Sequence, residues 1–417
     1  MGFNTDVLYA GRQEAASQGA TLAPLVQSSA FAYRTMEDLE RVFANRAAGF
    51  VYTRVGNPTV AAFERRVAAL ERGFAAVACA SGMAAVSQTF QTLLAAGDEV
   101  LASAGLYGGT IQFNALLRNL GVTVRYAPHF TPDELESLVT DRTRLVFGEV
   151  ISNPGLGVTD IRAVADWSHA HGLPLVLDST TATPFLVRPI ELGADIVVHS
   201  TSKYINGSGN GVSGIVVDSG RFRWDFDRYP ALAPFRQFGA LAAHVRLRQD
   251  VMPCFGGCLA PFNAYLNLVG VETLGLRMER ICRNASALAH ALAALPGVTV
   301  NHPSLDAHPQ SALARCQFRD GLAGGILTLR LGSRERALRV AESLRYATIA
   351  SNIGDVRTLV ICPATTLFLH NTPEERAAAG VFEDTLRVSV GIEDPEDLVA
   401  DFKKAIESWK KEDRHAD

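Results

Sequence analysis

The sequence predicts an α/β fold in which a large, mostly parallel sheet is covered by helices and is followed by a smaller α+β domain. Between residues 75 and 219, short β-rich runs alternate with helical patterns, and the runs are apolar on both faces. This alternation is typical of buried parallel strands. After about residue 255 the pattern changes to long helical stretches. A chain of 417 residues is long enough to bury both cores.

We expect three regions along the chain. Residues 1–58 form an arm in which only "TMEDLERVFANR" has a helical pattern. Residues 59–255 form the large domain, which begins in the helical "NPTVAAFERRVAALE" and has strands at "AAVACAS", "EVLAS", "TVRYAP", "TRLVFGEV", "PLVLDS", "ADIVVHS" and "SGIVVDS". Residues 256–417 form the small domain, with a long helix at "GVETLGLRMERICRNASALAHALAAL" and later strands such as "GILTLRLG" and "TLRVSVGIED".

The composition favours small-molecule chemistry. The formal charge of −4 comes from 39 basic and 43 acidic side chains spread along the chain, so neither nucleic acid nor a membrane surface is an expected partner. The first residues lack a signal-peptide pattern, and we expect a cytoplasmic protein. The six cysteines are too scattered for a disulfide framework, and "CFGGC" lacks the second ligand pair of a zinc site, so no metal is predicted.

Two ionisable residues stand at the ends of neighbouring strands. Asp178 ends one apolar run, and Lys203 follows the next run directly after Ser200 and Ser202. In open α/β sheets, ligands bind at the carboxyl ends of the strands. Alone, such an Asp is usually a turn residue and such a Lys a solvated charge. Their conjunction predicts a shared site.

This conjunction fits pyridoxal phosphate. Removing a Cα proton from an amino acid requires an electron sink, which this cofactor provides. Lys203 supplies the amine for a Schiff base, and Asp178 supplies an anion for the pyridine nitrogen. The candidate phosphate donors are the hydroxyls of Ser200 and Ser202 and the backbone N–H groups of Gly82 and Met83 in "ASGMAA", at a predicted helix N-terminus.

A competing dinucleotide motif is present nearby. Gly209, Gly211 and Gly214 spell G-x-G-x-x-G, but they lead into the run "GIVVDS". A dinucleotide fingerprint follows a strand and opens a helix. We therefore interpret these glycines as a turn behind the lysine.

Six motifs resemble the Cys/Met-metabolism family of pyridoxal-phosphate enzymes. They are "YTRVGNPT", "SGMAA", "LYGGT", "LDST", "HSTSKYINGSGN" and "LRVSVGIED", in order over nearly the whole chain. The resemblance implies the aspartate-aminotransferase-like fold (fold type I) and a homotetramer built of tight dimers. It also implies that the arm brings Tyr52 and Arg54 to the cofactor phosphate of the neighbouring subunit.

The resemblance implies further roles within one subunit. Lys203 would be the Schiff-base lysine and Asp178 the partner of the pyridine nitrogen. Tyr107 would stack on the ring and help with protons, and Asn153 would face the cofactor's phenolic oxygen. Arg387 would hold the substrate α-carboxylate, a task that suits a planar bidentate fork.

Within the family, the sequence is similar to those of the O-acetylhomoserine sulfhydrylases. Gly109 stands where methionine γ-lyases carry a cysteine, and Asn352 where lyases usually have serine. In contrast to most relatives, Leu367 and Phe368 occupy the place of a Thr-His pair beside the substrate, and we expect them to favour a bulkier or less polar nucleophile.

The resemblance implies γ-replacement on an O-activated homoserine, with Lys203 moving the Cα and Cβ protons. His370 could take over part of the role of the missing imidazole next to the substrate. A γ-lyase, or a synthase that uses a larger or carbon nucleophile, would use the same residues and stays an alternative. A non-catalytic binding protein is disfavoured because Lys203, Tyr107 and Arg387 are all present.

Overall fold

Seven strands build the larger sheet of the computed structural model, which describes residues 2–11, 19–369 and 371–413. The five strands from β6 to β3 are parallel, and β7 runs antiparallel to β6 and β1. The prediction of a mostly parallel α/β sheet is confirmed. The strand order is β1 (Ala75–Cys79), β7 (Gly214–Asp218), β6 (Ile196–His199), β5 (Leu175–Asp178), β4 (Thr143–Glu149), β2 (Glu99–Ser103) and β3 (Thr123–Ala127).

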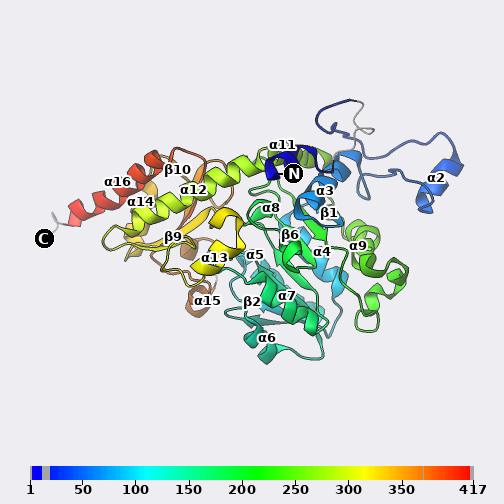
Figure 1. Ribbon diagram of the computed structural model, residues 1–417, viewed down its shortest axis with the longest axis horizontal. Helices are drawn as coiled ribbons and strands as arrows, with labels where there is room; N and C mark the ends of the chain where they lie inside the picture. Colours follow the sequence, from blue (N-terminus) through cyan, green and yellow to red (C-terminus); the bar gives the residue numbers. More distant parts are fainter. Residues whose placement is uncertain (1, 12–18, 370, 414–417) are drawn as a thin grey trace.

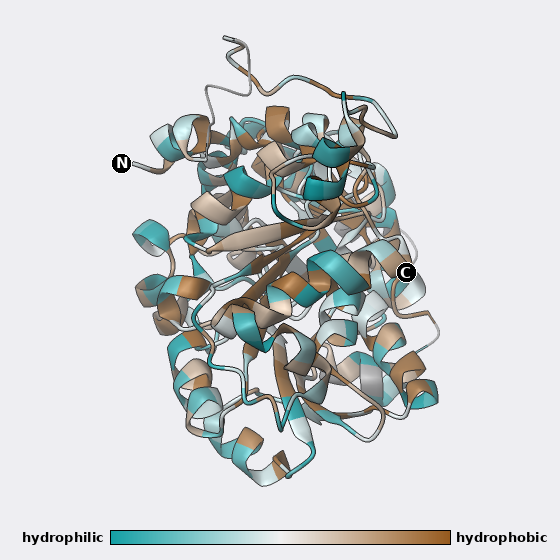
Figure 2. Cartoon of the chain, turned by 90° about the vertical axis from the view of Figure 1, so that its right-hand side faces the viewer, coloured by the Kyte–Doolittle hydropathy of each residue, from teal (hydrophilic) through white to brown (hydrophobic). Residues whose placement is uncertain are grey.

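Helices cover both faces of this sheet because its strands are apolar on both sides (Figure 1). Val197 packs in one hydrophobic cluster and Val198 in the other, as the two-residue period of a strand requires. Figure 2 shows the hydrophobic strands running through the middle, with hydrophilic surfaces on the outer helices. One face is covered by α4 (Gly82–Leu93), α5 (Gly108–Leu117) and α9 (Ala242–Arg246), and the other by α3 (Pro58–Glu71), α7 (Ile161–Ala170) and α12 (Leu274–Ala293).

Capping side chains fix where the helices next to the sheet begin. Asn57 accepts the N–H of Thr59 at 2.9 Å, and Pro58 occupies the first turn of α3. Ser81 accepts the N–H of Ala84 at 3.0 Å and starts α4. Because Ser81 lies two residues after β1, the N-terminus of α4 stands at the carboxyl end of that strand.

A second sheet of five strands builds the smaller part of the molecule. Its strands β10 and β11 are parallel and the other neighbours are antiparallel. Helices α12, α14 (Arg334–Ser343) and α16 (Pro395–Asp413) share a hydrophobic cluster with it. Since α12 packs in the cores of both sheets, it joins the two parts. The order is β10 (Ala347–Ile349), β11 (Thr358–Ile361), β12 (Thr385–Ser389), β9 (Ile326–Arg330) and β8 (Thr299–Asn301).

The N-terminal region contains one helix that the sequence analysis does not predict. Helix α1 (Phe3–Tyr9) buries Phe3 and Val7 in the core beside α12, and its seven residues are too few to show a helical period. The predicted helix α2 (Met36–Phe43) is present, has no buried residue and lies away from both sheets (Figure 1). The remaining α-helices are α6 (Pro132–Leu138), α8 (Thr183–Leu186), α10 (Met252–Phe255), α11 (Pro261–Val271), α13 (Ser311–Gln317) and α15 (Pro373–Ala378). Among the described residues, no helix has the length and apolar character needed to cross a bilayer.

Candidate active site

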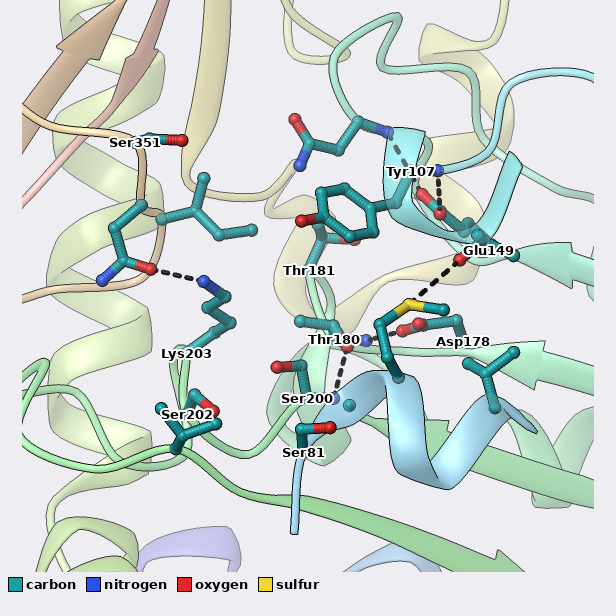
Figure 3. Close-up of a pocket in the computed structure, with 18 of the residues that line it drawn as sticks. Ser81, Tyr107, Glu149, Asp178, Thr180, Thr181, Ser200, Ser202, Lys203 and Ser351 are labelled. Atoms are coloured by element: carbon teal, nitrogen blue, oxygen red, sulfur yellow. Dashed lines mark hydrogen bonds between the residues drawn. The ribbon is translucent and has the colours of Figure 1, made fainter. Parts of the chain in front are cut away.

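The carboxyl ends of the central strands open into a cavity of about 310 Å³. Asp178 ends β5, and the turn after β6 carries Lys203 into the same cavity from the opposite side (Figure 3). This is the edge at which α/β sheets gather ligands. The predicted site residues that line the cavity are Gly82, Met83, Tyr107, Asn153, Asp178, Ser200, Ser202, Lys203, Asn352, Leu367 and Arg387.

Small residues shape the corner where β1 meets α4. A Cβ atom on Gly82 would lie 2.5 Å from Cβ of Ser200, so only glycine fits against that residue. The N–H groups in the first turn of a helix have no partners within the helix, and they suit a phosphate. Gly82 and Met83 occupy this turn of α4. The hydroxyl of Ser202 donates to the carbonyl of Ser213 at 3.0 Å, and its contact with the phosphate stays a prediction.

Lys203 is held by an amide oxygen. Its Nζ donates to Oδ1 of Asn352 at 2.5 Å. Burial, and then the positive charge of Arg387, lower the pKa of Lys203. More of the amine is therefore neutral at a given pH, and the neutral form acts as nucleophile and proton acceptor.

Arg387 comes from β12 of the smaller sheet and is 3% exposed. Its Nη1 donates to Oδ1 of Asn153 at 3.2 Å, and its Nη2 donates to the carbonyl of Asn352 at 3.0 Å. Its buried Nε has no hydrogen-bond partner among the described residues. Burial lowers the pKa of Arg387 to about 10, which still leaves a cation at neutral pH. A carboxylate entering the cavity would satisfy this charge and the free donor.

Two buried carboxyl groups lie opposite Lys203. Glu149 at the end of β4 is in register with Asp178 at the end of β5. Burial raises the pKa of Asp178, although its Oδ1 accepts the N–H of Thr180 at 2.8 Å. Burial, and then the charge of Asp178, raise the pKa of Glu149 well above its ordinary value. A cation beside Asp178 would lower the pKa of both carboxyl groups, and a protonated pyridine nitrogen is such a cation.

The Tyr107 ring points into the cavity (Figure 3). A Cβ atom on Gly109 would lie 2.5 Å from Cε1 of this ring, so the absence of a side chain at Gly109 makes room for it. The glycine that distinguishes the chain from the cysteine-bearing pattern thus acts through Tyr107.

Leu367 and Phe368 have different environments. Leu367 lines the cavity, whereas Phe368 is 1% exposed and packs in a cluster with Ala364, Ala379 and Val381. We therefore correct the prediction that Phe368 contacts the substrate, because its ring is enclosed by this cluster. His370 lies outside the described residues.

Tyr52 and Arg54 lie outside this cavity. They border a separate hollow with Thr53 and Pro261, and Nη1 of Arg54 donates to the carbonyl of Pro253 at 2.7 Å. Their predicted role concerns the cavity of a neighbouring subunit and stays a prediction.

Comparison with known proteins assigns the chain to a family. The model of the family described as "Cys/Met metabolism PLP-dependent enzyme" matches residues 4–407. The chain belongs to this family. It is 37% identical to a homocysteine synthase of Schizosaccharomyces pombe, over 97% of this chain and 98% of that one. It is 38% identical to O-acetyl-L-homoserine sulfhydrylase 1 of Thermus thermophilus, over 97% and 100%. Curated methionine γ-lyases also match, at 36–38% identity.

A solved structure supports the same assignment. The crystal structure of a putative O-acetylhomoserine (thiol)-lyase from Campylobacter jejuni has a TM-score of 0.93 to this chain, with 31% identity over 98% of this chain and 100% of that one. That crystal structure contains N′-pyridoxyl-lysine-5′-monophosphate. The fold-type-I architecture expected for the Cys/Met-metabolism family is therefore confirmed.

The Cys/Met-metabolism family depends on pyridoxal phosphate, and the cavity fits this cofactor. The glycine-lined corner at α4 would hold the phosphate, and Asp178 would face the pyridine nitrogen. Lys203 would bind the aldehyde carbon. Tyr107 would cover the ring.

Several lining residues of this family member were not predicted. Glu149, Thr110, Thr180, Thr181 and Ser351 all face the cavity. For Glu149 a signal exists, because it ends the run "TRLVFGEV" and parallel neighbouring strands end at the same sheet edge. Thr110 and Thr180 end the motifs "LYGGT" and "LDST", but no role was predicted for them. Thr181 and Ser351 carry no signal, since such residues are common in turns.

Proposed function

We propose that the protein catalyses γ-replacement on an O-activated homoserine, with O-acetyl-L-homoserine as substrate and hydrosulfide or a simple thiol as nucleophile. The main observation behind this proposal is that Lys203, Asp178 and Arg387 line one cavity. The relatives named homocysteine synthase and O-acetyl-L-homoserine sulfhydrylase support this reaction class.

The protein's own groups divide the work. Pyridoxal phosphate, when bound, supplies the electron sink that makes the Cα and Cβ protons acidic. Arg387 binds the α-carboxylate and fixes the amino acid. Nζ of Lys203 accepts the Cα proton and gives it up again within the site, and the amine, neutral once more, then accepts a Cβ proton. Asn352 holds this amine in place. Acetate then leaves from Cγ, the nucleophile adds there, and Lys203 returns the protons.

The charges of the cavity support acetate over more highly charged leaving groups. Among the described lining residues, Lys203 and Arg387 are the only cations. Both have tasks with the amino acid, so a succinyl carboxylate or a phosphoryl group would lack a basic partner from this chain. The same reasoning disfavours cysteine as nucleophile, because it brings a second carboxylate.

The apolar wall supports a nucleophile without a charged head group. Val212, Ile353 and Leu367 line the cavity without hydrogen-bonding side chains. An apolar pocket accepts alkyl groups and selects weakly among them. A larger thiol or a carbon nucleophile is compatible with this wall and stays part of the proposal.

The assembly belongs to the same proposal. We infer a homotetramer of two tight dimers, in which residues 1–58 act as an arm that brings Tyr52 and Arg54 to the neighbouring subunit. The lack of any buried residue in α2 supports an arm that packs on another chain. Residues 59–255 and 256–417 would be the cofactor-binding and small domains, and the protein would work in the cytoplasm.

Product analysis tests the reaction. The holoenzyme is incubated with O-acetyl-L-homoserine and either hydrosulfide, methanethiol or cysteine, with O-succinyl-L-homoserine and Lys203→Ala as controls. Mass spectrometry should detect homocysteine from hydrosulfide and methionine from methanethiol, and little product from cysteine. Release of a 2-oxo acid and ammonia at the same rate with and without thiol would instead establish a γ-lyase.

A further inference from the structure

Glu149 is a buried carboxyl group for which the proposed chemistry has no use. It is 6% exposed and ends β4 beside Asp178 on β5 (Figure 3). Placing a second carboxyl group next to a buried one costs free energy unless its oxygens are hydrogen-bonded. The partners of Glu149 therefore indicate why it is there.

Each oxygen of Glu149 accepts one backbone N–H. Oε1 accepts the N–H of Tyr107 at 2.5 Å, and Oε2 accepts the N–H of Asn153 at 3.2 Å. Tyr107 is the residue before α5, and its own side chain does not cap that helix. Glu149 thus accepts the N–H of the N-cap residue, as the acidic side chain of a capping box does. The start of α5, and with it the Tyr107 backbone, is thus attached to the end of β4.

The second contact leads to the substrate-binding arginine. The backbone N–H of Asn153 donates to Glu149, and the side-chain Oδ1 of Asn153 accepts from Nη1 of Arg387. One carboxyl group therefore connects the ring expected to cover the cofactor with the amide that orients the guanidinium. These partners lie 42 residues before Glu149 and four residues after it.

We propose that Glu149 is a positioning residue of the reaction, which fixes the Tyr107 ring and, through Asn153, Arg387. This inference rests on the proposed function for the identity of the substrate, but not for the placement of the ring. This positioning role requires two acceptor oxygens at the full reach of a glutamate side chain. Glutamine keeps the reach but turns an –NH₂ group toward one N–H donor, and aspartate keeps the carboxyl group but is one methylene shorter.

The test compares Glu149→Gln and Glu149→Asp with the wild-type holoenzyme. Asp401→Asn is the matched control, because this carboxylate also accepts two backbone N–H groups, from Arg345 at 2.9 Å and Tyr346 at 3.0 Å, on α16 outside the cavity. The readouts are visible circular dichroism of the bound cofactor, the cofactor dissociation constant, and kcat and KM for O-acetyl-L-homoserine. Thermal unfolding reports the structural cost in each variant.

We expect both Glu149 variants to change the circular dichroism of the cofactor band, while Asp401→Asn leaves it unchanged. Loss of a hydrogen bond from the N–H of Tyr107 or of Asn153 should lower kcat/KM about tenfold. Part of this loss should be a rise in KM, because Arg387 is then less well oriented for the substrate carboxylate. In a Tyr107→Ala background the effect of Glu149→Gln on kcat should be smaller, because the ring it positions is gone. A purely structural role would instead lower stability by the same amount in all backgrounds.

An unchanged cofactor band in both variants, or a fully additive effect with Tyr107→Ala, would overturn the proposal. The two hypotheses fail separately. If the wild-type protein does not convert O-acetyl-L-homoserine, the proposed function is wrong, whereas the circular dichroism comparison still decides the role of Glu149.

Discussion

Replacing Leu367 by threonine tests whether this wall residue selects the nucleophile. Leu367 lines the cavity, and the neighbouring Phe368 holds the loop by its buried ring. Burying one methylene group contributes about 0.8 kcal/mol, which corresponds to about a fourfold change in kcat/KM. Propanethiol has two methylene groups more than methanethiol. If both methylene groups pack on the wall, kcat/KM of the wild-type enzyme should be roughly 15-fold higher for propanethiol than for methanethiol. Leu367→Thr should remove most of this preference and favour hydrosulfide.

The assay measures kcat/KM for hydrosulfide, methanethiol, ethanethiol and propanethiol at fixed O-acetyl-L-homoserine. Exchange of the Cα proton in deuterated water is followed in parallel, because we propose that Lys203, Asp178 and Arg387 serve that earlier step. Leu369→Thr is the matched control, since Leu369 is 55% exposed and does not line the cavity. If Leu367→Thr slows proton exchange as strongly as it changes the thiol preference, the residue shapes the cofactor site and our reasoning is refuted.

Four further predictions follow from single contacts. Borohydride should fix the cofactor covalently on Lys203, and a modified peptide from any other lysine would contradict the assignment. Gly109→Ala places a Cβ atom 2.5 Å from Cε1 of Tyr107 and should displace the ring. The circular dichroism of the cofactor should then change, and a spectrum identical to that of the wild type would contradict the displacement. Phe368→Ala should lower the free energy of unfolding by about 3–5 kcal/mol in urea denaturation, whereas a fully exposed ring would cost little. Arg54→Ala should weaken cofactor binding, and mixing it with inactive Lys203→Ala should restore activity in hybrid dimers; verified hybrids without activity would count against a site shared between subunits.

The central part of the site could be predicted because it depends on strand ends. Runs that are apolar on both faces identify β5 and β6, and parallel strands end at a common edge, so Asp178 and Lys203 had to lie near each other. Glycine at the start of α4 follows the same logic, since a helix beginning at that edge must approach the next strand closely. The roles of Tyr107 and Arg387 required the family resemblance, because nothing local distinguishes them from ordinary loop and strand residues.

Contacts between distant segments explain what the sequence analysis missed. Leu367 and Phe368 are adjacent and equally apolar, and a loop has no period that assigns one to a cavity and the other to a core. Val381, thirteen residues later, packs in the same cluster as Phe368 and encloses its ring away from the cavity. Glu149 was overlooked in the same way, since its partner Tyr107 lies on another strand connection. With the roles proposed for Leu367 and Glu149, substrate selection and ring placement depend on packing between loops, while attachment of the cofactor to Lys203 depends on the sheet. Changes in the loops can therefore alter the nucleophile without disturbing the proton transfers at Lys203.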